Sequence, residues 1–395
     1  MKTPRMVNAM GNIDDELITS TSGKGNRKNR NWIKWSCIAA SVVAVIIAGV
    51  VIFPHIFKSD SSDNENYDSR YKDFHIQTSE LGVVWPWEYK TIEEKYQTID
   101  VNGKEFHNRG SEISSEYVGE LMGSYEAAGH EEISDVIHYE NFDVYNIKNI
   151  SSERLIAVKM EDIYYVFISG DYNSPDTFGE VLESYALDES VKLKRFSLEG
   201  KNIKNNYYTL QDDAYIWDVL KQCKDAPKAD SLGWHERERE YVSFTVTSEI
   251  IGVYKRVMYV TEDGYVWTNI FDVEYLYFIG EDNAGEIIRY AKENSTEAES
   301  EPFMNTVIGE VVEITDEYIM IDDSSLCKNP SEGISYKILI KDMRISRYVE
   351  NDMVKLNEFI QVTYKGEVNE SDNSIGQAVS IAEVIISENN VFIPE

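Results

Sequence analysis

Two histidines in an acidic stretch are the first residues whose types could do chemistry. They open and close the sequence HEEISDVIH, which runs from His130 to His138. A zinc-binding helix of the metalloprotease kind needs two histidines four residues apart on one face. The spacing here is eight residues, which is typical of a turn that leads into a strand. We therefore expect solvated surface side chains in this stretch and no metal ligands.

No other motif in the chain specifies a reaction. The stretch TSGKG resembles part of a phosphate-binding loop, but Ile18 stands where that loop needs its first glycine, and Gly25 stands where it needs Ser or Thr. Adjacent carboxylates such as Asp322 and Asp323 are expected by composition alone in a chain with 70 acidic residues. The sequence therefore predicts a protein without catalytic residues, metal or cofactor, and not an enzyme.

Two groups of apolar residues could bind a partner. Trp85 and Trp87, in the stretch VVWPWEYK, could form a binding surface, although Trp and Tyr side chains also close small cores. Met10, Ile13 and Leu17 share one helical face in the N-terminal stretch AMGNIDDELI, whose acids interrupt an otherwise basic tail. This pattern predicts docking of a cytoplasmic protein. A passive tail is the alternative, because so short an isolated helix is marginally stable.

A long apolar segment follows this tail. No charged residue occurs from Trp35 to Phe57, and a helix of this length spans roughly 34 Å, enough for a hydrocarbon layer of about 30 Å. Five Lys and Arg residues precede the segment closely, and three acids follow it. The sequence therefore predicts a cytoplasmic tail at 1–35 and one transmembrane helix at 36–57. A cleaved signal peptide is the alternative, but no A-x-A site follows the segment.

The net charge of -32 is unevenly distributed along the chain. Residues 1–57 carry seven basic and three acidic residues, whereas the remainder carries 31 basic and 67 acidic residues. A region this acidic repels phosphate backbones, so its charge excludes nucleic acid as a partner. The partners that we expect are the membrane, a protein or polymer outside, and a protein in the cytoplasm.

Polar segments divide the outer region into domains. Residues 58–72 are poor in apolar side chains and predict a flexible stalk, and residues 295–302 predict a linker for the same reason. Between them, four segments carry apolar residues at positions i, i+3, i+4 and i+7, which indicates helices with one buried face. These residues are Val118, Leu121, Met122 and Tyr125; Phe178, Val181, Leu182 and Tyr185; Ile216, Val219, Leu220 and Cys223; and Ala284, Ile287, Ile288 and Ala291.

The four predicted helices form two similar pairs, which indicates an internal duplication. The stretch IDVNGKEF, with a tight hairpin turn predicted at Asn102 and Gly103, is similar to FSLEGKNI further along the chain. We therefore expect an α+β fold with repeats at 73–190 and 191–294. Each repeat should be a hairpin, a helix, three strands and a closing helix, forming an antiparallel sheet with helices on one face.

The C-terminal region, residues 303–395, predicts an all-β barrel. Strands are expected near 306–314, 317–322, 334–340, 359–364 and 376–386, with a short helix or turn at 342–355. Five strands with a helix between the third and the fourth are the layout of the OB fold. The stretches VIGEVVEITDEYIMIDD, YKILI, FIQVTYKGEV and AVSIAEVII resemble a small OB-like domain of Gram-positive surface lipoproteins. With seven basic and 17 acidic residues from 302 onward, this domain is not expected to bind oligonucleotides.

The N-terminus carries a second resemblance. The stretch GNIDDELI, the basic residues after it, the stretch WIKW and the apolar segment resemble the start of single-pass membrane proteins of Clostridia-type Gram-positive bacteria. Some members of that group are described as anti-sigma-factor-like. The resemblance implies a cell-membrane protein whose C-terminal domains lie outside the cytoplasm. We expect a non-catalytic binding or sensing protein of the cell envelope, with a surface enzyme acting on cell-wall polymer or a structural assembly subunit as alternatives.

Overall fold

The structure is a computed structural model that describes most of the chain beyond the expected stalk. The described residues are 69–387, except for 73, 80–83, 172, 201–205, 230–239, 300–303 and 342. The predicted cytoplasmic tail, the transmembrane helix at 36–57 and most of the stalk lie outside the described residues. Among the residues that are described, no helix is both long enough and apolar enough to cross a bilayer.

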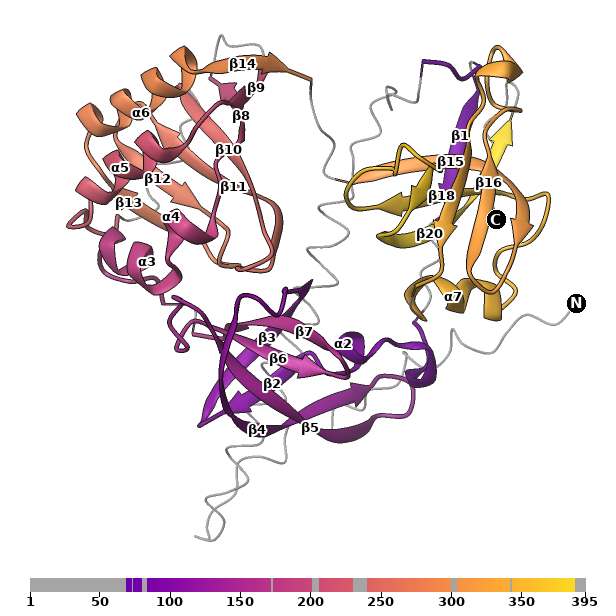
Figure 1. Ribbon diagram of the computed structural model, residues 1–395, viewed down its shortest axis with the longest axis horizontal. Helices are drawn as coiled ribbons and strands as arrows, with labels where there is room; N and C mark the ends of the chain where they lie inside the picture. Colours follow the sequence, from indigo (N-terminus) through magenta and orange to yellow (C-terminus); the bar gives the residue numbers. More distant parts are fainter. Residues whose placement is uncertain are drawn as a thin grey trace, which may run out of the picture. The chain divides into compact units, whose positions relative to one another are not determined.

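The first sheet is a closed barrel of six strands in the order β2-β3-β7-β6-β5-β4 (Figure 1). A 3-10 turn, η2 (Trp87–Tyr89), and a short helix, α2 (Ile92–Lys95), precede it. Asn102 and Gly103 have positive φ angles of 57° and 84°, as a tight hairpin turn requires, so the predicted turn is confirmed. The strands are β2 (Thr98–Val101), β3 (Lys104–Glu112), β4 (Val118–Glu131), β5 (Val136–Ile147), β6 (Leu155–Met160) and β7 (Ile163–Ser169).

The helix predicted from Val118 to Tyr125 is wrong, because these residues belong to strand β4. The pairing of β4 with β5 shifts register between Val118 and Leu121 and again between Leu121 and Gly123. Each irregularity inserts extra residues on β4 and interrupts the alternation of side chains between the two faces. Val118 packs in one apolar cluster, Met122 and Tyr125 pack against another, and Leu121 is 58% exposed, so the helix-like spacing does not correspond to one buried face.

The second sheet is open and has helices on one face. Its seven strands follow the order β13-β12-β11-β10-β8-β9-β14, and Figure 1 shows the helices packed along one side. The strands are β8 (Arg195–Glu199), β9 (Asn206–Leu210), β10 (Tyr241–Ser248), β11 (Val253–Thr261), β12 (Tyr265–Thr268), β13 (Tyr275–Phe278) and β14 (Ser295–Ala298). The helices are α3 (Phe178–Tyr185), α4 (Leu187–Ser190), α5 (Ala214–Gln222) and α6 (Glu281–Glu293).

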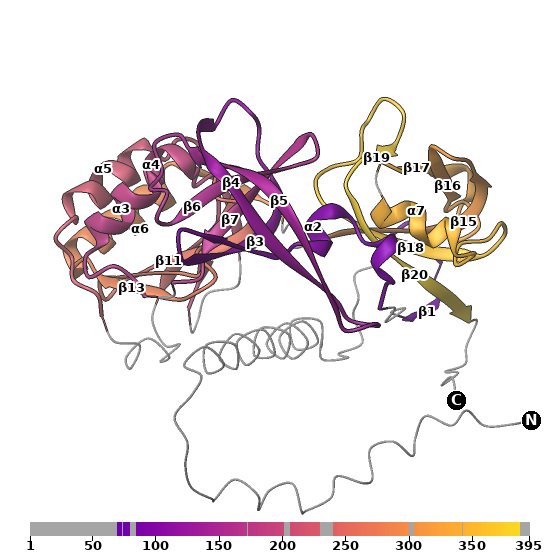
Figure 2. The same cartoon turned by 90° about the horizontal axis from the view of Figure 1, so that it is seen from below.

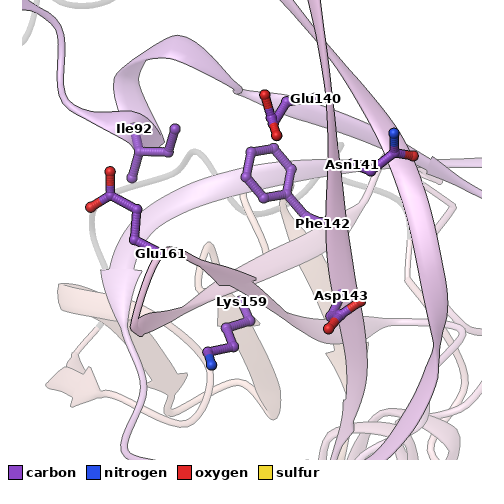
Figure 3. A pocket seen from close by; sticks show the side chains of 7 residues that line it. All are labelled: Ile92, Glu140, Asn141, Phe142, Asp143, Lys159 and Glu161. Carbon is purple, nitrogen blue, oxygen red and sulfur yellow. The ribbon is translucent and has the colours of Figure 1, made fainter.

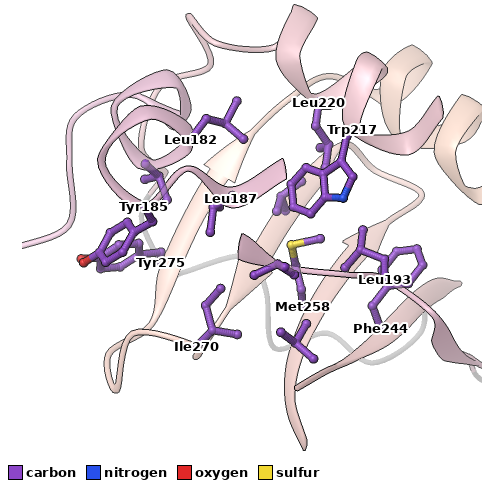
Figure 4. Packing of buried hydrophobic residues seen from close by; sticks show 14 of the residues in the cluster. Leu182, Tyr185, Leu187, Leu193, Trp217, Leu220, Phe244, Met258, Ile270 and Tyr275 are labelled. Carbon is purple, nitrogen blue, oxygen red and sulfur yellow. The ribbon is translucent and has the colours of Figure 1, made fainter. Parts of the chain in front are cut away.

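The core of this layer confirms three of the four predicted helical faces. The apolar positions predicted on α3, α5 and α6 are all buried, and Cys223, at the end of α5, is a buried thiol whose pKa is raised by burial. Figure 4 shows Trp217 directed toward Met258 of the sheet, with Leu182 and Leu220 at the level of the helices. Burial of such side chains stabilises the layer by about 1.5–3 kcal/mol each.

The predicted duplication is wrong, because the two halves have different architectures. Residues 73–190 contain the closed barrel, whereas residues 191–294 contain most of an open sheet. Helix α3, which was predicted to close the first repeat, packs instead in one apolar cluster with α5 and α6. The expected sheet with helices on one face therefore occurs only in the second half, and strands dominate the fold as a whole.

The third sheet has the order β1-β20-β18-β15-β16-β17-β19. Helix α7 lies between its third and fourth C-terminal strands, and β17 pairs in parallel with β19, which only two residues separate from β20. This connectivity is consistent with the predicted OB-like layout. The elements are β1 (His75–Ser79), β15 (Asn305–Ile314), β16 (Tyr318–Asp322), η4 (Pro330–Glu332), β17 (Ser335–Leu339), α7 (Met343–Glu350), β18 (Phe359–Tyr364), β19 (Ser374–Ile375) and β20 (Ala378–Ser387).

Residues 75–79, which were assigned to the first repeat, and residues 295–298, which were assigned to a linker, both pair with distant strands. Strand β1 pairs with β20, so residues 75–79 and the C-terminal strands build one sheet although the whole barrel and the helical layer lie between them in sequence. Residues 295–298, predicted as the start of a linker, form β14 and pair with β9. Backbone pairing with distant strands, which composition does not reveal, orders both segments.

A buried carboxylate holds residues 70–72, the end of the predicted stalk, on the third sheet. Asp323 is fully buried and accepts hydrogen bonds from the Tyr71 hydroxyl (3.1 Å), the Arg70 guanidinium (3.1 Å) and the backbone N–H of Ile334 (2.6 Å). Burial and the nearby Asp323 raise the pKa of Tyr71 far above its ordinary value, so this hydroxyl remains a donor. We call Arg70, Tyr71 and Asp323 the stalk latch.

A buried arginine joins the barrel to the helical layer. Arg109 on β3 donates to the backbone carbonyls of Ile251 (2.9 Å) and Ile270 (2.8 Å), and it lies 2.8 Å from the carboxylate of Asp272. Its side chain is 3% exposed, whereas Arg256, which pairs with the same carboxylate, is 42% exposed. Burial lowers the pKa of Arg109, and the charge of Asp272 opposes this shift.

Candidate functional site

The two tryptophans predicted to dock a partner are used within the fold. Trp85 packs edge-on against Tyr348 of α7 at 5.2 Å, and the Arg347 guanidinium lies 4.7 Å from the centre of its ring. Trp85 therefore joins the apolar cluster of the third sheet, which favours the packing interpretation of this residue. The other predicted docking residues, Met10, Ile13 and Leu17, lie outside the described residues, and their role stays a prediction.

Trp87 packs on the barrel instead. Its ring stacks on His138 of β5 with 4.2 Å between the ring centroids, and it meets Tyr96 edge-on at 5.7 Å. A Cβ atom on Gly129, the residue paired with His138 across the hairpin, would lie 2.5 Å from both the Trp87 ring and the carbonyl oxygen of Lys95. Only glycine therefore fits beneath this tryptophan.

Ion pairs between α7 and α2 add a second link next to these two tryptophans. Arg347 forms two hydrogen bonds, of 2.8 and 3.2 Å, with the carboxylate of Glu94, and Arg344 pairs with the buried Glu93. Burial alone would raise the pKa of Glu94, but the hydrogen bond from Arg347 and the other favourable interactions outweigh it and lower the pKa. The segment from Trp85 to Glu94 is thus a structural connector between α7 and the barrel.

We expect Gly129→Ala to lower the free energy of unfolding by about 1–3 kcal/mol, because the added methyl group overlaps the Trp87 ring and the backbone of Lys95. Gly285→Ala is a matched control, since a Cβ atom there would meet nothing within 4 Å and helix α6 should gain up to about 1 kcal/mol. Urea denaturation measures both effects. If Gly129→Ala leaves the free energy of unfolding unchanged, Trp87 can move away without a loss of stability.

The two histidines of HEEISDVIH lie at the tip of the β4–β5 hairpin and pair with carboxylates. His130 contacts Asp135 at 2.8 Å and His138 contacts Glu131 at 2.9 Å, and a turn at 132–135 separates the two strands. The predicted turn into a strand is therefore confirmed. Within the described residues, no group of three or more His, Cys, Asp or Glu side chains is arranged to hold a metal ion.

The tip of this hairpin exposes a cluster of large apolar side chains. Ile133, Val136, Ile137 and Tyr139 are 45–62% exposed, and they are four of the 13 large apolar residues that are exposed among the described residues. Ile137 and Tyr139 point to the same face because they are two residues apart on one strand. Figure 2 shows β4 and β5 as the longest ribbons of the barrel, so we call residues 126–142 the hairpin arm. Exposed apolar clusters of this kind mark interaction sites.

A groove of about 550 Å³ begins where the hairpin arm leaves the barrel. Phe142 and Ile92 form its apolar floor, and the carboxylates of Glu140, Asp143 and Glu161 surround it. Figure 3 shows Glu161 beside Ile92 at one side and Glu140 beside Phe142 at the other. Lys159, the single cation among the lining residues, lies 4.0 Å from Asp162. The groove is therefore acidic with an apolar floor.

The comparisons with known proteins returned no match. No protein-family model matches the chain, and neither a curated protein nor a solved structure is similar to it. The geometry of the hairpin arm and its groove therefore carries the functional interpretation.

The sequence interpretation did not identify the arm as a candidate site. A signal for a strand was available in VIHYENF, which is rich in β-branched and aromatic residues and contains neither Pro nor Gly. Such a composition does not distinguish an exposed strand from one that is buried on one face, so it did not identify a site. Only the three-dimensional structure shows that these apolar side chains lie outside the barrel core.

Proposed function

We propose that this protein is a non-catalytic binding or sensing protein of the cell envelope, anchored by residues 36–57 with its acidic domains outside the cytoplasm. Under this proposal the hairpin arm is the part that contacts an extracytoplasmic partner. The observation that carries the proposal is the exposed apolar cluster of Ile133, Val136, Ile137 and Tyr139 at the end of a long hairpin.

Three features of the sequence and the fold support this proposal. The apolar segment from Trp35 to Phe57 has basic residues before it and acidic residues after it, as the positive-inside rule requires of a helix with a cytoplasmic N-terminus. The OB-like layout of the third sheet fits the resemblance to surface lipoproteins, and we propose that this domain belongs to the OB class. The stalk latch then ties the chain next to the anchor to a folded domain.

A single labelling experiment tests both orientation and binding. An Ile137→Cys variant is treated, on intact protoplasts, with a membrane-impermeant maleimide that carries a photoactivatable group. Cys223 and Cys327 are buried and should not react. We expect labelling from outside, followed on illumination by a crosslinked product that Tyr139→Ser reduces about tenfold or more, since a buried aromatic anchor contributes strongly to binding.

The matched control is Glu183→Cys on the exposed side of α3, which should be labelled equally but give no crosslinked product. Absence of labelling at residue 137 in intact protoplasts, with labelling after lysis, would refute the orientation. Equal crosslinking from residues 137 and 183 would refute the hairpin arm as the contact.

A further inference from the structure

Among the residues that the structure describes, none pairs with the outer edge of β5 along the hairpin arm. Strand β5 pairs with β4 along Val136–Ile147, but it pairs with β6 only over Asp143–Asn146. In the described part of the chain, no strand, bridge or backbone hydrogen bond covers the side of residues 136–142 that faces away from β4. Alternate residues of this segment therefore direct their N–H and C=O groups outward.

This edge lacks most of the features by which proteins usually block strand addition. Such features are proline, charged side chains and above all lysine, a β-bulge or a very short strand, and of these the edge carries only the acidic Glu140. The segment VIHYENF at 136–142 contains neither Pro nor Lys, and its pairing with β4 is regular from Gly123 to Glu131. Both register shifts lie at the other end of β4, between Val118 and Gly123. The edge is thus a regular template for another strand.

We infer that the outer edge of β5 at Val136–Phe142 accepts an extended basic segment of a partner protein as an added strand. This inference rests on the proposed function and names the partner's chemistry. The groove lies where β6 ends, so an added strand would continue the sheet from the end of β6 along the hairpin arm. Main-chain hydrogen bonds would supply affinity, and the side chains that line the groove would supply specificity.

The negative charge of the groove favours a basic segment as its occupant. Glu140, Asp143 and Glu161 surround it, and its single lysine, Lys159, lies close to another carboxylate. Because neighbouring residues on a strand point to opposite faces, lysine or arginine side chains on one face of the added strand would meet Asp143, and apolar residues on its other face would meet Phe142. A second copy of this chain is disfavoured, because the region beyond residue 57 carries 31 basic and 67 acidic residues and would repel itself.

The test uses the full-length chain in detergent and a blocked eight-residue peptide of alternating lysine and valine. Hydrogen exchange of the backbone amides is followed with and without the peptide. We expect the outward-facing amides within 136–142 to exchange about tenfold more slowly or better with the peptide bound, because they gain hydrogen-bond partners. The exchange rates of the amides of Asp143–Asn146, where β5 already pairs with β6, should not change. Unchanged rates there would show that the barrel remains folded.

Two control peptides separate strand addition from simple charge attraction. A peptide of the same composition, N-methylated at the residues that face β5, keeps its charge but loses its donors and should not protect the edge. A peptide with glutamate in place of lysine should not bind. Equal protection by either control would overturn the inference.

Variants of the protein test the groove itself. Glu140→Lys combined with Asp143→Lys should weaken binding of the lysine peptide about tenfold or more, because both carboxylates are exposed and line the groove, and the change reverses their charge. Glu183→Lys, which is equally exposed but lies on α3, should leave binding unchanged. If the peptide leaves the edge unprotected while crosslinking through residue 137 still depends on Tyr139, strand addition is wrong and the proposed function stands. If the peptide does not protect the edge and crosslinking through residue 137 does not depend on Tyr139, both strand addition and the proposed function are wrong.

Discussion

Replacing Asp323 by alanine should lower the free energy of unfolding of the third sheet by about 3–5 kcal/mol, the loss that follows when one partner of a buried charge pair is removed. The carboxylate is fully buried and accepts hydrogen bonds from Tyr71, Arg70 and the N–H of Ile334. In the alanine variant, the amide of Ile334 would be left without an acceptor, and the Tyr71 hydroxyl would keep only the more distant carbonyl of Ile308, at 3.4 Å. Urea denaturation measures the loss, and limited proteolysis should cleave near residues 70–79 before the barrel.

The controls separate charge from hydrogen bonding in the stalk latch. Asp323→Asn keeps an acceptor for Ile334 but removes the charge that faces Arg70, so it should lose less than the alanine variant. Tyr71→Phe combined with Asp323→Ala should lose less than the sum of the single variants, because the two residues share one hydrogen bond. A loss under about 1 kcal/mol for Asp323→Ala would contradict the stalk latch.

Arg109→Ala should destabilise the joined barrel and helical layer by about 3 kcal/mol, near the lower end of the range for a broken buried ion pair. The carbonyls of Ile251 and Ile270 would lose their donors, whereas Asp272 would keep Arg256 as a partner. Thermal unfolding followed by calorimetry measures the effect. We expect a single transition at a lower temperature, because the barrel and the helical layer also share one apolar cluster.

Arg256→Ala is the matched control for this prediction, because it removes the exposed partner of the same carboxylate. Exposed pairs contribute little, so the loss should stay below about 1 kcal/mol. Arg109→Lys should be intermediate, because one ammonium group cannot reproduce the planar fork that reaches two carbonyls and a carboxylate. If Arg109→Ala and Arg256→Ala lower the free energy of unfolding equally, the burial of Arg109 adds nothing to its contribution to stability.

Regular elements with one buried face were predictable from the sequence. The helical spacing of Phe178, Val181 and Leu182 gave α3, and the alternation in FIQVTY gave β18. In both, the period of apolar residues matches the geometry of the element, because each face keeps one environment along its length. The Asn102–Gly103 turn was also predictable, since few other dipeptides tolerate two positive φ angles.

The failures have a common physical origin in long-range pairing. The helix-like spacing from Val118 to Tyr125 occurs on strand β4, where it does not correspond to one buried face, and the order of strands that closes the barrel leaves no local signal. The role of Tyr71 depends on Asp323, more than 250 residues away, so the stalk composition could not reveal it. The open edge of β5 was hidden for the same reason, because sequence does not show where β6 stops pairing.

The pairing of β1 with β20 also sets an order of events during synthesis. A chain made from its N-terminus presents residues 75–79 early, but their partner strand emerges only near residue 387. Because loop-closure entropy grows slowly with length, a separation of roughly 300 residues adds little to the equilibrium cost of this pairing. The separation does delay the pairing in time, so the barrel and the helical layer can fold first while β1 has no partner. The synthesis of β20 therefore decides when β1 becomes ordered.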